Sequence, residues 1–358
     1  MRIAQVAPLF ESVPPKRYGG TERVVHYLTE ELVKRGHEVT LFASGDSETS
    51  AELCPCTPKA LRLGSHYTDA TAYETAQLEI VFRQAYRFDV IHFHTGHLHY
   101  PTSSRLETPH ISTLHGRLDI AEINQLYGVF NDIPLISISD NQRQPVPRAN
   151  WQATIYHGLP TDLYRLVDEP QEYLAFLGRI SPEKRLDRAI QIATTLGIPL
   201  RIAAKIDKVD SDYYASVIKP MIDGNDLVEF VGELDDCDKQ AFLGNARALL
   251  FPIDWPEPFG LVMIEAMACG TPVIAWHNGS VPEVMRDGTS GFIVDSMQDA
   301  VDAVKKSDAL ARPDVRAYFD ERYTAGRMAE DYEQVYASLI VKQRATGWTP
   351  HRGSLIGV

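Results

Sequence analysis

The fold of this chain is decided by residues 2–44, RIAQVAPLFESVPPKRYGGTERVVHYLTEELVKRGHEVTLFAS. Residues 2–10 predict a buried strand, residues 19–36 carry apolar side chains at helical spacing and end on Gly36, and residues 37–44 predict a second strand. Two strands joined through a helix must cross over and therefore pair in parallel. The segment predicts an α/β fold built on a Rossmann-like sheet.

The same alternation continues outward from this segment and then restarts. A turn-rich stretch at residues 155–170 separates the two halves and predicts a linker. We therefore expect two doubly wound parallel-sheet domains that face each other across a deep cleft, with ligands at the carboxyl ends of the strands. Further strands are expected at 89–95, 110–116, 134–140, 173–179, 199–205, 228–234, 248–253 and 271–277, and helices at 185–197, 239–247 and 260–270.

Composition excludes several classes of protein. The chain has 358 residues and a net charge of −13, with 14 Lys and Arg against 17 Asp and Glu in residues 1–160 and 21 against 31 in the rest. Neither half offers a bulk basic surface, which argues against nucleic acid and an anionic membrane as partners, although a local basic patch for a membrane stays open. No signal peptide or spanning segment is expected, and Cys54, Cys56, Cys237 and Cys269 lack metal spacing, so we expect a cytoplasmic protein with free thiols.

The chemistry is concentrated in residues 254–275, DWPEPFGLVMIEAMACGTPVIA. Two prolines hold Glu257 in a loop, and a helix begins near Gly260, where its free N–H groups suit a phosphate. Glu265 stands among apolar residues and needs a hydrogen-bonding partner. That partner is either a structural Arg or backbone group, or a ligand diol.

This segment resembles the Glu-x7-Glu signature of the retaining nucleotide-sugar glycosyltransferases numbered family 4, which have the GT-B fold. The resemblance covers nearly the whole chain. It implies that Glu257 contacts the donor sugar, that Glu265 binds the ribose, and that the amides of Phe259, Gly260 and Leu261 approach the sugar and diphosphate. It also implies domains at 1–160 and 161–325, a terminal helix at 326–345 that returns to the first domain, and a tail at 346–358.

Two cations follow a predicted strand in FLGRISPEKR, residues 176–185. Arg179 and Lys184 can hold a diphosphate and offset charge on the leaving phosphate. A solvated basic turn is the alternative. The family carries an Arg and a Lys at this step, and its spacing selects Lys184 over the adjacent Arg185.

A glycine pair, Gly19 and Gly20, lies between the first strand and the first helix. Glycine permits close approach of a ligand, and in the family this loop faces the donor phosphates. The Gly-x-Gly-x-x-Gly fingerprint is absent, which counts against a nicotinamide dehydrogenase.

Histidines cluster in IHFHTGHLH, residues 91–99, and again at His115. A metal site is one hypothesis, but no carboxylate stands in the run, and we interpret it as a strand end that lines the cleft. His115 matches the family histidine that reaches the sugar. Val231, in the strand at 228–234, marks the place where relatives wrap the nucleobase, and Lys205 ends the preceding strand and is included as a further candidate.

The resemblance, together with these features, implies an enzyme that transfers a hexosyl unit from a UDP- or GDP-sugar to a hydroxyl group on a sugar, lipid-linked or small-molecule acceptor. The resemblance implies a front-face mechanism with no metal and no cofactor beyond the donor. A GT-B phosphorylase or a sugar-nucleotide epimerase is the alternative among enzymes. A two-lobed binding protein without catalysis is the alternative from another class.

Overall fold

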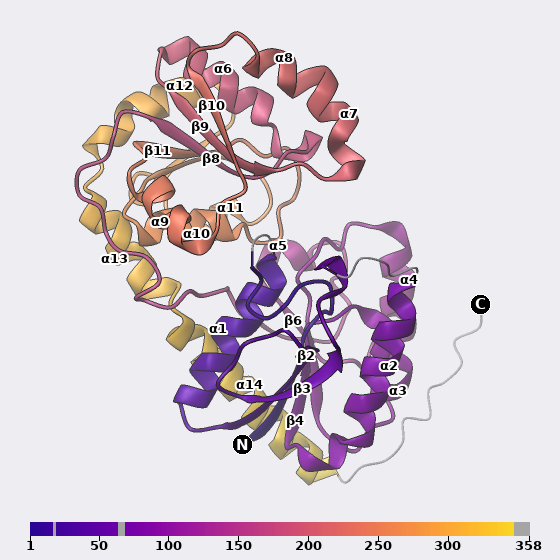
Figure 1. The fold of residues 1–358 in the computed structure, drawn as a ribbon. Helices are drawn as coiled ribbons and strands as arrows, with labels where there is room; N and C mark the ends of the chain where they lie inside the picture. Colours follow the sequence, from indigo (N-terminus) through magenta and orange to yellow (C-terminus); the bar gives the residue numbers. More distant parts are fainter. Residues whose placement is uncertain (17–18, 64–68, 347–358) are drawn as a thin grey trace. The chain divides into compact units, whose positions relative to one another are not determined.

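The computed structural model describes residues 1–16, 19–63 and 69–346, so the tail predicted at 346–358 lies outside the described residues apart from its first position. The chain forms two compact units (Figure 1). Unit 1 comprises Met1–Ile138, Arg143–Ile155 and the chain from Gly326 onward, and unit 2 comprises Ser139–Gln142 and Tyr156–Ala325.

Unit 1 is built on a parallel sheet in the order β3-β2-β1-β4-β5-β6-β7. The register pairs Ile3 with Val39 on one side and with Val90 on the other, so β1 lies between the strands that follow it in sequence. This is the crossover expected from residues 2–44. The strands are β1 (Arg2–Val6), β2 (Glu38–Ser44), β3 (Glu52–Thr57), β4 (Val90–Phe93), β5 (His110–Thr113), β6 (Leu135–Ser137) and β7 (Trp151–Thr154).

Alternation along the strands of unit 1 divides an apolar layer from a polar one. Ile91 and Phe93 of β4 pack with α2, whereas His92, between them, contacts Tyr336 of the C-terminal helix α14. The two faces of the sheet are thus covered by helices distant in sequence. The helices of this unit include α1 (Gly20–Lys34), α2 (Ala70–Arg83), α3 (Tyr100–Ser103), α4 (Ala121–Val129) and α14 (Ala325–Thr346), while α5 (Asp140–Arg143) lies at its boundary with unit 2.

Unit 2 contains a second parallel sheet, in the order β10-β9-β8-β11-β12-β13. The reversal of strand order beside β8 is the switch point of a doubly wound fold. This confirms the predicted α/β class and the two Rossmann-like sheets. The strands are β8 (Leu174–Arg179), β9 (Leu200–Lys205), β10 (Val228–Gly232), β11 (Ala248–Phe251), β12 (Val273–Trp276) and β13 (Gly291–Val294).

Helices cover both faces of this second sheet (Figure 1). Helix α6 packs against β8, β9 and α12, and α10 packs against β11, β12 and the helices α9 and α13. The apolar core on the α6 side includes Phe176, Ile190 and Leu250, all essentially buried. The principal helices are α6 (Leu186–Leu196), α9 (Asp236–Gly244), α10 (Leu261–Ala268), α12 (Met297–Lys306) and α13 (Arg312–Arg322), with shorter segments α7 (Ser211–Tyr213), α8 (Lys219–Ile222) and α11 (Val281–Val284).

Three strands, β3, β7 and β13, were not expected from the sequence. Each lies at an end of its sheet, where only one neighbour pairs with it. Pro55 interrupts the pattern of β3, which an edge strand tolerates because its outer N–H groups are not needed for pairing. Edge strands carry weaker hydrophobic patterns than central ones, which explains why they were missed.

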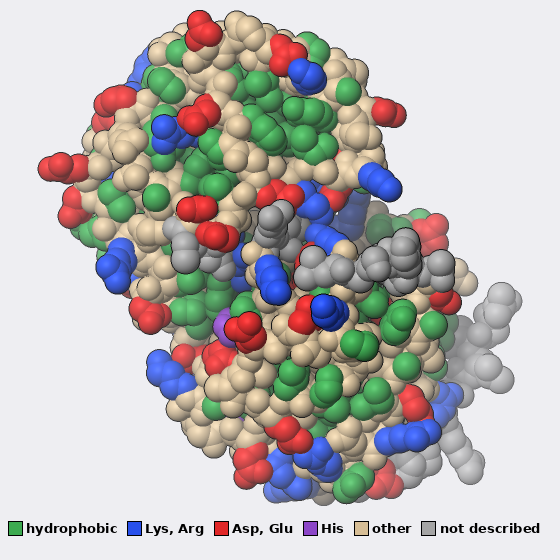
Figure 2. Space-filling view, in the orientation of Figure 1, with side chains coloured by type: hydrophobic (Ala, Val, Ile, Leu, Met, Phe, Trp, Pro, Cys, Tyr) green, Lys and Arg blue, Asp and Glu red, His purple; other side chains and the backbone are tan. Residues whose placement is uncertain are grey.

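The surface carries charges of both signs, in agreement with the expectation from composition that neither half has a bulk basic surface. On the face shown in Figure 2, acidic and basic side chains are interspersed over each unit. Among the described residues, no helix combines the length and the apolar character that crossing a bilayer demands.

The interior of unit 1 is unusually rich in histidine. His92 and His99 are fully buried, and burial lowers the pKa of each well below its ordinary value. Burial also lowers the pKa of His110 to about 4 and that of His115 to about 3. The interpretation of residues 91–99 as a cleft lining is wrong for His92, His94 and His99, which are core residues.

We predict that unit 1 loses stability steeply below pH 6.5. The unfolded chain binds a proton on each histidine near that pH, whereas the folded rings stay neutral, so stability is complete above about pH 6.5 and falls as pH decreases towards 4. Each buried histidine contributes a slope of about 1.4 kcal/mol per pH unit. The free energy of unfolding, measured with urea between pH 5 and 7, should show this slope. His99→Asn should lower the slope by the contribution of one histidine, about 1.4 kcal/mol per pH unit. An equal reduction in the exposed control His97→Asn would contradict the assignment.

Candidate functional site

A carboxylate held by two side chains lies at the carboxyl end of the central strands of unit 2. Glu257 follows β11 in a loop, and Lys184 follows β8. Lys184 Nζ donates to Glu257 Oε2, and Trp255 Nε1 donates to the same oxygen at 3.0 Å. Lys184 Nζ also lies 5.1 Å from the centre of the Trp255 ring and 5.5 Å from that of Phe251, within cation–π range. The predicted sugar and phosphate residues thus contact each other.

Glu265 lies in the middle of α10, the helix that follows the Glu257 loop, and is only 4% exposed. Lys239 of α9, itself buried, donates from Nζ to Glu265 Oε1 at 3.0 Å. The sequence required a partner for this carboxylate, and the partner is a lysine rather than an arginine or the backbone. A buried carboxylate and ammonium compensate each other's desolvation only while both are present.

The start of α10 lies between the two glutamates. Gly260 precedes the helix with φ 79° and ψ 67°, a left-handed conformation that a side chain disfavours. The helix begins at Leu261, and a helix start leaves its first N–H groups without intrahelical acceptors. The Phe259 ring is buried and meets His157 edge-on at 4.8 Å between centroids, which anchors the turn from within unit 2.

Arg179 and Lys205 end the adjacent paired strands β8 and β9, and their Cα atoms are partners in the register. Both cations contact carboxylates. Lys205 Nζ lies 2.6 Å from Asp207, while Arg179 donates to Glu183 and lies 3.8 Å from Asp207 and 3.5 Å from Asp210. Burial raises the pKa of Asp210. The sequence predicted the two cations but not the acidic groups around them.

The glycine pair occupies the start of α1 in unit 1, with Gly19 at the N-cap and Gly20 as the first helical residue. A Cβ on Gly19 would come within 2.7 Å of Pro15, so the backbone is closely packed there. Glu22 in the first turn is also buried, and burial raises its pKa. A carboxylate therefore already lies at this helix start.

His115 follows β5 and continues a chain of hydrogen bonds in unit 1. Its Nε2 lies 2.9 Å from His94 Nδ1, and His94 Nε2 lies 2.7 Å from Gln5 Oε1. The Gln5 amide donates from Nε2 to Tyr336 Oη at 3.2 Å, so its Oε1 accepts from His94. For neutral rings, His94 Nδ1 then accepts from His115 Nε2–H, which makes His115 Nδ1 the acceptor nitrogen of that ring.

Val231 lies on β10, one of the two edge strands of the second sheet, where the register with β9 shifts between Phe230 and Gly232. Such a bulge turns the backbone out of the ladder.

The structure gathers Lys184 with Glu257 and Arg179 with Lys205 in unit 2, and places Gly19, Gly20 and His115 in unit 1. Sequence reasoning missed Lys239, Trp255 and Gln5. The only signal for Lys239 was its position in a helix and for Gln5 its position in a strand, whereas Trp255 lies in the loop before Glu257.

Two family matches cover most of the chain. Residues 18–156 match the family described as Glycosyltransferase Family 4, and residues 165–323 match the family described as Glycosyl transferases group 1. The chain is a glycosyltransferase. The resemblance inferred from residues 254–275 is therefore confirmed at the level of these domain types.

Two curated relatives of this chain are named as a glycosyltransferase and a glycogen synthase. The chain is 25% identical over 345 residues to a D-inositol 3-phosphate glycosyltransferase of Mycolicibacterium smegmatis, covering 77% of this chain and 75% of the relative. It is also 25% identical over 405 residues to a glycogen synthase of Mycobacterium tuberculosis, covering 93% and 94%.

Solved structures support the GT-B fold of the glycosyltransferase. A sucrose-phosphate synthase from Thermosynechococcus elongatus has a TM-score of 0.79 at 19% identity, covering 95% of this chain and 99% of the other. AviGT4, a glycosyltransferase involved in avilamycin A biosynthesis, has a TM-score of 0.73 at 24% identity, covering 95% and 98%. The Anabaena protein Alr3699/HepE, solved with UDP and glucose, has a TM-score of 0.73 at 18% identity, covering 94% and 100%.

We predict that Lys239→Met destabilises unit 2 of the glycosyltransferase by about 3–5 kcal/mol, because it leaves the Glu265 carboxylate buried without its cation. Replacing both members, as Lys239→Met with Glu265→Leu, should recover most of the loss in urea unfolding. Lys219→Met serves as the control, since Lys219 pairs with Asp223 on the surface, and it should change stability little. A wild-type unfolding midpoint in Lys239→Met would contradict this view of the pair.

Proposed function

We propose that this glycosyltransferase moves a hexosyl unit from a UDP- or GDP-sugar to a hydroxyl group of a sugar, lipid-linked or small-molecule acceptor, with retention at the anomeric carbon. The observation that carries the proposal is the Glu257 carboxylate, which Lys184 and Trp255 hold beside the start of α10. A carboxylate next to helix N–H groups that lack intrahelical acceptors suits a ligand that has hydroxyl groups joined to a diphosphate.

Each residue predicted from the sequence has a role in this proposal. Glu257 accepts hydrogen bonds from the sugar hydroxyls, and Glu265 accepts them from the ribose through the oxygen that Lys239 leaves available. The backbone of β10 at Val231 borders the nucleobase, with Lys205 on the neighbouring strand. The diphosphate is bound by Arg179, Lys184 and the amides of Phe259, Gly260 and Leu261. Gly19, Gly20 and His115 stay predicted ligand contacts within unit 1.

Charge balance around Arg179 sets a condition on donor binding. Arg179 contacts three carboxylates, those of Glu183, Asp207 and Asp210. A diphosphate oxygen must therefore replace some of these contacts to bind the guanidinium. A planar guanidinium has five N–H donors, which allows it to exchange one acceptor for another while it keeps the rest.

The proposed reaction is a front-face substitution. The bond between the anomeric carbon and the phosphate oxygen breaks, the acceptor oxygen bonds to that carbon from the same side, and the acceptor proton passes to the departing phosphate. Lys184, Arg179 and the start of α10 stabilise the charge that develops on the phosphate, which is the task a metal ion performs elsewhere. His115 Nδ1, an acceptor nitrogen, orients a sugar hydroxyl.

Two findings among related proteins support the substrate classes. The Anabaena protein has been solved with UDP, with UDP and glucose, and with UDP-glucose, which favours a uridine donor. The relative from Mycolicibacterium smegmatis is named for D-inositol 3-phosphate, which favours a small polyol acceptor.

We predict turnover of a nucleotide sugar without added metal. In a panel of UDP-glucose, UDP-galactose and GDP-mannose, the protein should slowly release UDP or GDP from at least one donor, and the rate should survive exhaustive treatment with EDTA. Proton NMR of the transfer product should show the anomeric configuration of the donor. Inverted product, or activity that Mg²⁺ or Mn²⁺ restores after chelation, would overturn the proposed mechanism.

We predict different effects for the two glutamates. Glu265→Gln removes a charge-assisted contact of roughly 1.5–3 kcal/mol and should raise the Kd for UDP or GDP about ten- to a hundredfold. Glu257→Gln should mainly lower kcat. Calorimetry and initial rates measure the two effects, and melting curves of both variants control for the loss of the Lys239 and Lys184 ion pairs. Equal weakening of nucleoside diphosphate binding would contradict the division of roles.

A further inference from the structure

Arg185 has the one positive φ among the non-glycine residues that the structure describes, with φ 52° and ψ 47°. It joins the short helical turn Pro182–Lys184 to α6 and follows Lys184 directly. The left-handed region is disfavoured for a residue with a Cβ, so an outlier there needs support from its surroundings.

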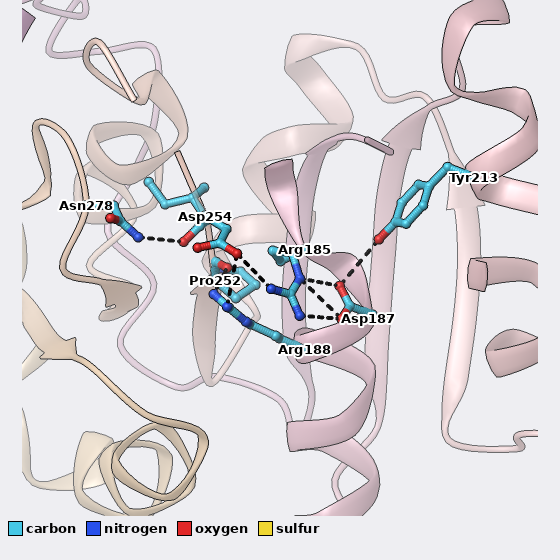
Figure 3. A network of polar contacts seen from close by, with 8 residues as sticks. Arg185, Asp187, Arg188, Tyr213, Pro252, Asp254 and Asn278 are labelled. Carbon is cyan, nitrogen blue, oxygen red and sulfur yellow. Dashed lines mark hydrogen bonds and ion pairs between the residues drawn. The ribbon is translucent and has the colours of Figure 1, made fainter. Parts of the chain in front are cut away.

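The side chain of Arg185 supplies that support through two carboxylates (Figure 3). Its Nε and Nη2 donate to the two oxygens of Asp187 at 2.9 and 2.8 Å, which is a bidentate pair. Its Nη1 donates to Asp254 Oδ2 at 2.9 Å. Asp187 lies on α6, whereas Asp254 lies in the loop that leads to Glu257, so one guanidinium bridges two segments.

Both carboxylates have further partners, as Figure 3 shows. Arg188 Nη2 lies 3.2 Å from Asp254 Oδ2, and Tyr213 Oη donates to Asp187 Oδ1 at 3.3 Å. Arg188 Nη1 also donates to the carbonyl of Pro252 at 3.3 Å. The bridge is therefore part of a network rather than a single surface ion pair.

The two segments are also joined through the backbone next to Lys184. The Asp254 N–H donates to the Glu183 carbonyl at 2.8 Å. Lys184 stands between this backbone contact and the Arg185 bridge. Its side chain contacts Glu257 and Trp255, whereas the side chain of Arg185 contacts Asp187 and Asp254. The left-handed backbone at Arg185 thus accompanies a separation of two adjacent cations, Lys184 and Arg185, whose side chains contact different groups.

We propose that Arg185 is a positioning residue for Lys184: its bridge to Asp187 and Asp254 fixes the left-handed turn that directs the Lys184 ammonium to Glu257 and Trp255. The role in turnover rests on the proposed function, because it requires Lys184 to act on the donor diphosphate. Arg185 itself contacts no reacting atom in this scheme. A solely structural role would stabilise unit 2 without changing the geometry of the Lys184 cluster.

The first experiment does not depend on activity. In protein labelled with ¹⁵N at tryptophan, the Trp255 indole N–H signal reports its hydrogen bond to Glu257 and can be assigned with Trp255→Phe. Arg185→Gly and Arg185→Ala should both shift this signal. Arg247→Ala is the matched control, because Arg247 makes a comparable two-point contact with Asp308 in the same unit, and it should leave the signal in place. An unmoved signal in both Arg185 variants would overturn the proposal.

The second experiment separates positioning from stability. Glycine adopts the left-handed conformation freely and alanine does not, so Arg185→Ala should melt on the order of 2–4 °C below Arg185→Gly. Both variants lack the bridge and should lose the same factor in kcat/KM, about tenfold or more, for whichever of UDP-glucose, UDP-galactose or GDP-mannose the wild type uses. A loss of kcat/KM that follows the melting temperature would instead assign Arg185 a structural role and overturn the proposal.

A double-mutant cycle connects the effect to Lys184. In a Lys184→Ala background, Arg185→Gly should cause no additional loss of kcat/KM, because the group that it positions is already absent. Independent, multiplying losses would overturn the proposal. If the wild type turns over no donor in the panel, the proposed function fails, whereas the Trp255 signal still decides whether Arg185 sets the geometry of the cluster.

Discussion

Parallel strand pairing is the constraint on which the rest of this structure depends. Every described strand pair in both sheets is parallel, so each sheet collects the carboxyl ends of its strands at one edge. Residues that follow β8, β9 and β11 are far apart in sequence but meet at that edge in unit 2. Arg179 and Lys205 are cross-strand neighbours, and Lys184 reaches Glu257 from the adjacent strand. Parallel pairing alone therefore brings these residues together, whatever their side chains are.

Burial of charge is the second organising principle, and it works by pairing. Glu257 and Glu265 are both largely buried, and each has a lysine within hydrogen-bonding distance. An unpaired carboxylate in either place would cost several kcal/mol, so the fold needs the two lysines as partners of the two glutamates. The two pairs differ in setting. The Lys184 pair joins the short helical turn Pro182–Lys184 to the loop after β11, whereas the Lys239 pair joins two helices.

Much of the fold could be predicted from the sequence because strand, helix and turn signals agree over residues 2–44 and again from 173 to 277. The central strands and one edge strand, β10, were found. The edge strands β3, β7 and β13 were not, since pairing on one side places fewer demands on a sequence. Candidate site residues were visible where a motif isolates them, as with Glu265 in an apolar helix. Their partners were not, because nothing local shows that Lys239 faces Glu265 or that Gln5 faces His94. The histidines misled for the same reason: a period of two indicates one face of a strand but not whether that face meets ligand, solvent or a helix.

The C-terminal helix has a consequence for how the protein is made. Tyr336 of α14 contacts His92 and Gln5 in the core of unit 1, and Tyr332 contacts Thr113. Residues 156–325, which form nearly all of unit 2, are synthesised between the first part of unit 1 and this helix. At the usual rates of translation, the polar face of the first sheet waits roughly 10–35 s for its cover. During that interval unit 2 can fold on the emerging chain, so the part of the protein that is made first is the last to be completed.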